Sequence, residues 1–87
     1  MSREKAEELG APILASIKGY AQASRESRYI ATVPGLAIQE LMKKNDLTVN
    51  DFDLMEINEA FAAVPLVSCL GILGMYKEEM DAKVNVN

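Results

Sequence analysis

The sequence predicts an α/β fold with a parallel or mixed sheet. Three helical patterns alternate with two short segments of period two, an order typical of layered α/β domains. The 87 residues are enough for one small domain, and 49% hydrophobic against 25% charged residues is a globular composition. We therefore expect one α/β unit around a hydrophobic core.

The first helix and the first strand are expected within the first 20 residues. Ser2 suits the N-cap position, and Gly10 offers a left-handed stop eight residues later. The stretch "ILASIKGYA" that begins at Ile13 then alternates with the period of a strand, and apolar groups fall on both faces. This pattern predicts a strand over residues 13 to 20 that is largely covered.

A second helix is expected from Pro34, because proline fits the first turn of a helix. Leu36, Ile38 and Leu41 supply its apolar face, and the lysines at 43 and 44 suit its negative C-terminal end. This pattern predicts a helix that packs one face on the core.

A capping turn and a second strand follow. Thr48 and Asp51 have the spacing of a capping turn, and "DLMEIN" after them has the alternation of a strand that ends at Asn58. The longest apolar stretch, residues 60 to 75, is shorter than the ~20 residues that span a bilayer and predicts a buried helix. Pro65 within it is tolerated only in the first turn or at a kink.

Composition excludes several functions. The net charge is −4 and no basic stripe is present, so we expect neither nucleic acid nor anionic lipid as a partner. Histidine is absent, which removes Ser-His and Cys-His nucleophile pairs and histidine-ligated metal sites, and we expect no bound metal. The charged N-terminus lacks the apolar stretch of a secretory signal, and the single cysteine agrees with a reducing compartment, so we expect a cytoplasmic protein.

The candidate site lies at Asn58 and Glu59. Both come at the carboxyl end of the second strand, where open α/β sheets usually bind ligands. From the residues alone, Asn58 is most simply a helix N-cap and Phe61 a core residue. Cys69 lies in the apolar helix without a basic neighbour and is expected to be buried packing rather than a nucleophile.

The ordered segments resemble the thiolase family, enzymes that condense or cleave acyl groups on coenzyme A through a cysteine thioester. "MSREKAEELG" looks like the family's helix after a core strand, "GLAIQELMKKNDLTVNDFDLMEINEAFAA" like its helix, turn, strand and Asn-Glu-Ala-Phe-Ala motif, and "KVNVN" like the strand that follows. In the related ketoacyl synthases a histidine typically replaces this asparagine, so Asn58 favours thiolase proper. The resemblance implies a fragment of a layered α/β/α domain with a mixed sheet.

The resemblance also implies roles for the site residues. Asn58 would hold a catalytic water that donates to the thioester oxygen in an oxyanion hole, and Glu59 would fix the turn. Phe61 would line the pocket for the acyl and pantetheine groups, and Ile30 stands where many thiolases have a pocket methionine. The implied substrate is a coenzyme A thioester, with no tightly bound cofactor. Arg25 and Arg28 could meet coenzyme A phosphates, but a polar loop predicts that they are solvated.

The chain also departs from the family pattern. The family's nucleophilic cysteine, its histidine and its second cysteine have no counterpart, so residues 1–87 resemble a partial C-terminal domain truncated at both ends and are expected to be inactive alone. The alternative is a small non-catalytic α/β interaction module derived from a thiolase gene. A fragment lacks sheet partners, so its unpaired strand edges predict self-association as a symmetric dimer, with or without domain swapping, or as a higher oligomer. The expected partner is therefore a second copy of the chain or the remainder of a thiolase.

Overall fold

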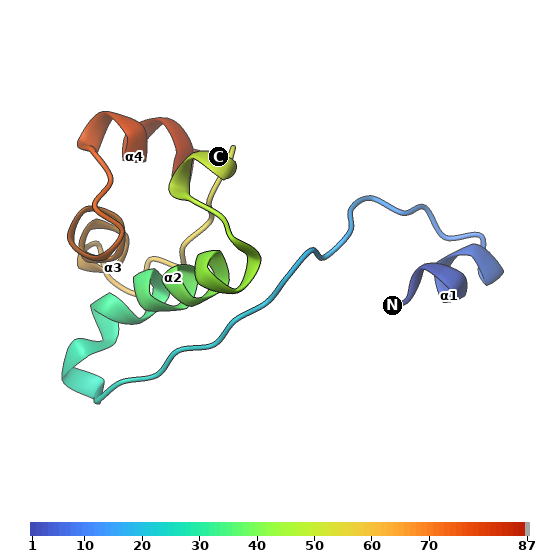
Figure 1. The fold of residues 1–87 in the computed structure, drawn as a ribbon, viewed down its shortest axis with the longest axis horizontal. Coiled ribbons are helices and arrows are strands. Elements are labelled where there is room, and N and C mark those ends of the chain that lie inside the picture. Colours follow the sequence, from blue (N-terminus) through green and yellow to red (C-terminus); the bar gives the residue numbers. More distant parts are fainter. Residues whose placement is uncertain (87) are drawn as a thin grey trace.

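A helical body and a long extended arm make up this chain (Figure 1). The computed structural model describes residues 1–86. The elements in chain order are α1 (Arg3–Glu8), η1 (Ser27–Thr32), α2 (Val33–Asn45), η2 (Val49–Asp51), α3 (Ala63–Leu66), η3 (Val67–Ile72) and α4 (Lys77–Lys83). Residues 11–26, which we call the arm, are extended and carry α1 away from the body, so the molecule measures 45 × 30 × 27 Å.

The core lies within the body. Its buried members all lie between residues 55 and 84: Met55, Ile57, Val64, Cys69, Met75, Met80 and Val84. Side chains from η1, α2 and the η2 region pack against this cluster, namely Ala31, Ile38, Val49 and Phe52. The residues around the candidate site are therefore the ones that fill the centre of the body.

The first two predicted helices are confirmed. The Ser2 hydroxyl accepts a hydrogen bond from the Lys5 amide at 3.2 Å, and Gly10 has a positive φ of 62° after α1. Pro34 lies in the first turn of α2, and that helix ends at Asp46, which is left-handed with φ 53°. In both helices the residue types at the ends decided where the helix begins and stops.

The predicted mixed sheet is not confirmed. Among residues 1–86 the β pairing is one parallel bridge, between Met55 and Val84. Residues 13 to 20 are extended as predicted. The prediction that other parts of the fold cover this segment is wrong, because Leu14 is 92% and Ile17 is 94% exposed. A strand needs a partner for its backbone N–H and C=O groups, and the described part of the chain offers none to the arm.

The apolar stretch after residue 60 forms an α-helical segment followed by a π-helical one. α3 is α-helical and continues directly into η3, a π-helical turn, and Pro65 stands in the first turn of α3 as predicted. Cys69 is fully buried while Leu66 is 41% and Leu70 is 36% exposed. The predicted buried helix is therefore buried on one side only.

A buried serine ties this helix to α2. The Ser68 hydroxyl donates to the Ala31 carbonyl at 2.8 Å and accepts from the Gly35 amide at 3.1 Å. A Cβ atom on Gly35 would lie 2.8 Å from Cβ of Ile72 and 2.9 Å from the Ser68 carbonyl oxygen. Glycine at position 35 thus permits the close approach that the serine bonds require.

Helix α4 did not appear among the predicted elements. Pairs of opposite charge four residues apart support it, Lys77 with Asp81 and Lys83 with Glu79, while Met80 is buried on its inner face. This spacing in "YKEEMDAK" is the sequence signal that could have identified the helix.

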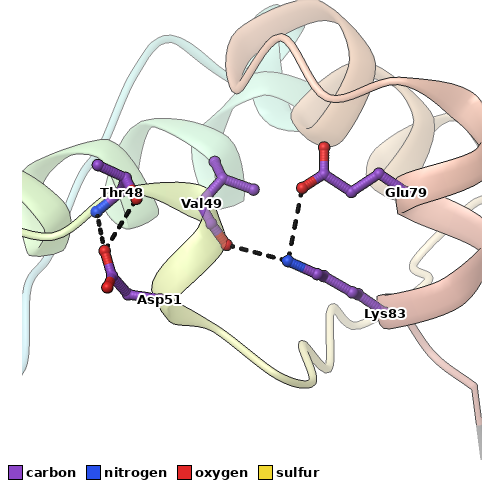
Figure 2. Close-up of polar contacts among 5 residues, drawn as sticks. All are labelled: Thr48, Val49, Asp51, Glu79 and Lys83. Carbon is purple, nitrogen blue, oxygen red and sulfur yellow. Dashed lines mark hydrogen bonds and ion pairs between the residues drawn. The ribbon is translucent and has the colours of Figure 1, made fainter.

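Lys83 connects the end of α4 to the turn at η2 (Figure 2). Its Nζ donates two long hydrogen bonds, of 3.4 Å to the Val49 carbonyl and 3.5 Å to Oε1 of Glu79. Beside it, the backbone N–H and hydroxyl of Thr48 donate to Oδ2 of Asp51 at 2.7 and 2.8 Å, which confirms the predicted capping turn. These contacts hold the segment that enters the parallel bridge, since the Met55 amide donates to the Lys83 carbonyl at 2.9 Å.

Within residues 1–86 no helix combines the length and the hydropathy that a bilayer crossing needs. The cytoplasmic location stays a prediction.

Gly35→Ala should destabilise the body. The added methyl would meet backbone and a branched side chain below 3 Å, so we expect a loss of about 1–3 kcal/mol in the free energy of unfolding, despite the better helix propensity of alanine. Gly71→Ala is the matched control, because its Cβ would find only Val67 at 3.9 Å. Equal urea midpoints for the two variants would contradict the close approach at Gly35.

The capping turn should be sensitive to acid. Hydrogen bonds from the Thr48 backbone and side chain, with a smaller contribution from the Lys83 charge, lower the pKa of Asp51 below its ordinary 3.8. Stability from this carboxylate is therefore fully present above pH 3.8 and is lost as pH falls through the lower folded-state value. In urea unfolding at a series of pH values, Asp51→Asn should cost stability at neutral pH and progressively less in acid. Asp53→Asn, which removes the same charge outside the turn, is the control, and a pH-independent deficit in Asp51→Asn would contradict the assignment.

Candidate functional site

The candidate site begins where the chain leaves the parallel bridge. Ile57 is 7% exposed and fixed in the core, whereas Asn58 and Glu59, the next two residues, lie at the surface. A buried anchor is thus followed at once by a polar amide and a carboxylate. The sequence predicted the site at the carboxyl end of a strand, and in the structure these two residues follow a segment that makes one parallel β-bridge.

Asn58 is not a helix cap. The N-cap of α3 is Ala62, four residues further on, and no side chain caps that helix, so the cap interpretation of Asn58 is wrong. Within residues 1–86 no side-chain hydrogen bond uses the Asn58 amide. Its carbonyl oxygen and its amino group are therefore available to a water or a ligand.

An amide from a later segment fixes the residues on both sides of Asn58. Oδ1 of Asn85 accepts from the Ile57 amide at 2.7 Å, and Nδ2 of Asn85 donates to the Ile57 carbonyl at 2.8 Å. The same Nδ2 donates to Oε1 of Glu59 at 2.8 Å. The family resemblance implied that Glu59 fixes the turn, but it did not indicate Asn85 as the partner.

The two predicted pocket residues are half-exposed. Phe61 is 51% and Ile30 is 49% exposed, so the interpretation of Phe61 as a core residue is wrong. Ile30 belongs to η1, which packs against α3 and η3, while Phe61 stands just before α3. Both side chains remain free to contact a ligand, and their pocket roles stay predictions.

The remaining reactive and charged groups behave as solvated or packed residues. Cys69 is fully buried, and burial raises the pKa of its thiol, so it stays protonated at neutral pH and serves as packing, as predicted. Arg28 is exposed and pairs with Glu26 at 2.9 Å. The guanidinium groups of Arg25 and Arg28 lie 4.6 and 4.8 Å from the ring centroid of Tyr29, a cation–π arrangement that the sequence analysis missed.

Neither of two hollows along the arm includes Asn58. One lies between α1 and residues 11–17. The other is mostly apolar and is lined by residues 16–19, Leu41, Asn45, Leu47 and Phe52. Within residues 1–86 no three acidic, cysteine or histidine side chains gather where they could hold a metal ion.

The amino-acid sequence of this chain matches those of known proteins. Residues 11–87 match the family described as the thiolase C-terminal domain. A 3-ketoacyl-CoA thiolase of Vibrio parahaemolyticus is 45% identical over 89 residues, which take in 100% of this chain and 22% of that protein. Acetyl-CoA acetyltransferase 2 of Arabidopsis thaliana is 44% identical over 87 residues, or 100% of this chain and 20% of that relative.

The fold of this chain is also similar to that of a solved protein structure. The crystal structure of the Bacillus anthracis acetyl-CoA acetyltransferase aligns with a TM-score of 0.78 and 41% identity, covering 99% of this chain and 21% of that one. This chain therefore spans about a fifth of the length of the relatives that it matches.

Proposed function

The chain belongs to the thiolase family, and from that premise we propose that it forms the part of a thiolase C-terminal domain that supplies an oxyanion-hole asparagine, Asn58. The proposed reaction is acyl transfer on coenzyme A, by Claisen condensation of thioesters or by the reverse thiolytic cleavage. The names of the relatives support an acyl-CoA thioester as the substrate class. No tightly bound cofactor, nucleic acid or membrane is part of the proposal.

The observation that carries this proposal is the state of the Asn58 side chain. It is exposed and makes no hydrogen bond within residues 1–86, although the residues before and after it are both fixed by Asn85. An amide without a partner of its own, on a backbone restrained by its neighbours, can bind and orient a water molecule. Fixed donors aimed at a developing oxyanion commonly lower a barrier by ~3 kcal/mol each.

The chemistry assigns the other residues supporting roles. When a base removes a proton from the carbon beside a thioester, negative charge moves to the thioester oxygen, and the water held by Asn58 donates to it. Phe61 and Ile30 would contact the acyl and pantetheine groups, and Glu59 would keep the turn in place. Since this sequence has no histidine and Cys69 is buried and protonated, we propose that residues 1–87 alone have no thiolase activity.

Asn58→Ala should slow a full-length thiolase that carries this segment at its matching position. We expect the rate of acetoacetyl-CoA cleavage to fall ~100-fold with coenzyme A affinity nearly unchanged, because a transition-state contact is lost. Asn50→Ala, which truncates an exposed asparagine in η2, is the matched control. Since Asn58 caps no helix, the melting temperature should not move.

Two results would contradict the proposal. A full rate in the Asn58→Ala enzyme would remove the oxyanion-hole role, and turnover by the isolated 87-residue chain that Cys69→Ser abolishes would show that the chain is a complete catalyst.

A second candidate function is favoured by the exposed arm. Leu14, Ile17 and Tyr20 are 92%, 94% and 70% exposed on an extended segment without a partner strand in the described part of the chain. An unpaired edge with apolar side chains is a template for another strand. We therefore propose, as the alternative to a catalytic part, an interaction module that pairs through the arm with a second copy of itself.

Arm-mediated association should appear as a dimer or a larger species. Light scattering during size exclusion at micromolar concentration is expected to give a mass above 9.5 kDa, and Leu14→Lys with Ile17→Lys should shift it towards the monomer. Ser24→Lys adds charge near the body end of the arm and should leave the mass unchanged. A sharp, cooperatively unfolding monomer of the unaltered chain would exclude this module.

A further inference from the structure

We propose that Asn85 is a positioning residue for Asn58, acting through its side-chain amide on the peptide groups and carboxylate that flank Asn58. This inference rests on the proposed function of Asn58 and adds a residue that acts on it from a different segment of the chain.

The side-chain amide of Asn85 replaces the backbone groups of a partner strand at one step of the ladder. Met55 donates to the Lys83 carbonyl and accepts from the Asn85 backbone N–H, both at 2.9 Å, which is one complete step of a parallel ladder. In a regular ladder the next step would bond the Ile57 N–H and C=O to backbone groups of the partner strand. Here the Asn85 backbone turns away at φ 51°, and its own side-chain amide bonds both groups of Ile57.

The residue type follows from this geometry. A left-handed φ is tolerated by asparagine better than by most non-glycine residues, and a primary amide copies the donor and acceptor of a peptide group. Nδ2 has two protons, and one goes to the Ile57 carbonyl while the other goes to the Glu59 carboxylate. A carboxylate only accepts, so the nitrogen must face Glu59, and this sets which way round the amide sits.

The consequence concerns the orientation of Asn58. The peptide group that precedes Asn58 is bonded at Ile57, and the carboxylate of the residue that follows it, Glu59, is bonded to the same amide, so the backbone around Asn58 is restrained. The Asn58 side chain leaves this fixed backbone without a hydrogen bond of its own. Asn85 therefore restrains the backbone from which the Asn58 amide projects.

Hydrogen exchange in the 87-residue chain tests the contact. Asn85→Gly keeps the positive φ without steric cost and removes only the amide. Exchange of the Ile57 N–H should become at least about tenfold faster, whereas the Met55 N–H, which bonds to the Lys83 carbonyl, serves as an internal control and should keep its rate. An unchanged Ile57 rate would overturn the proposal.

Asn85→Asp tests the same contact without a change in side-chain size. It keeps the Oδ1 acceptor, replaces the donating nitrogen by a second acceptor oxygen, and so sets a carboxylate against both the Ile57 carbonyl and Glu59. Adding Glu59→Gln returns a donor to that contact, so the double variant should exchange more slowly at Ile57 than Asn85→Asp alone. If Asn85→Gly does not fold, this pair of variants decides the question. Equally fast exchange of the Ile57 N–H in Asn85→Asp and in the double variant would then overturn the proposal.

Rates in the full-length thiolase carrying this segment test the positioning. Asn85→Gly should lower kcat about tenfold and leave KM within about twofold, because a displaced transition-state donor affects the chemical step. In the Asn58→Ala background the same substitution should change kcat less than about twofold, since nothing remains to position. A tenfold effect in both backgrounds would show that Asn85 acts elsewhere and would overturn the inference. If Asn58→Ala alone costs nothing, the proposed function fails, while the exchange measurement still tests the contact.

Discussion

The arrangement of the body depends on one short parallel contact between residues 55–57 and 83–85. Two backbone hydrogen bonds and the Asn85 amide join segments that are 28 positions apart, and the intervening chain must return through α3, η3 and α4 to bring them together. Met55, Ile57 and Val84 are buried around this contact. Pairing thus satisfies polar backbone groups at a place where apolar side chains are also removed from water.

A second buried polar group orders the other side of the body. Ser68, on the π-helical turn, bonds to η1 and to the first turn of α2, where an amide has no partner within its own helix. Because Gly35 has no Cβ, the two backbones can come close enough for that bond. Through this contact η1, which carries Ile30, takes a defined place beside the helix that follows Phe61.

Body and arm differ in how their apolar residues are used. The body encloses its apolar groups between short helices, whereas the arm presents Leu14 and Ile17 to solvent on an extended backbone. A related acetyl-CoA acetyltransferase shares this arrangement over 99% of the present chain but is several times longer. An extended segment with apolar residues on both faces fits a structure in which neighbouring strands and helices cover it, which is the setting that the proposed thiolase role would provide.

The sequence by itself determined the elements whose signals are local. Ser2 and Gly10 bounded α1, Pro34 and the two lysines bounded α2, and Thr48 with Asp51 formed the capping turn, because in each case the stabilising group lies within four residues of the group it serves. The ordered segments that include the motif around Asn58 likewise indicated the family. Tertiary structure decided the rest: whether the arm found a strand partner, that Asn58 caps no helix, that Phe61 is half-exposed, and that Asn85 holds both neighbours of Asn58. The contacts of Asn85 join groups 26 and 28 positions apart, and no local pattern of residues encodes which of them will meet.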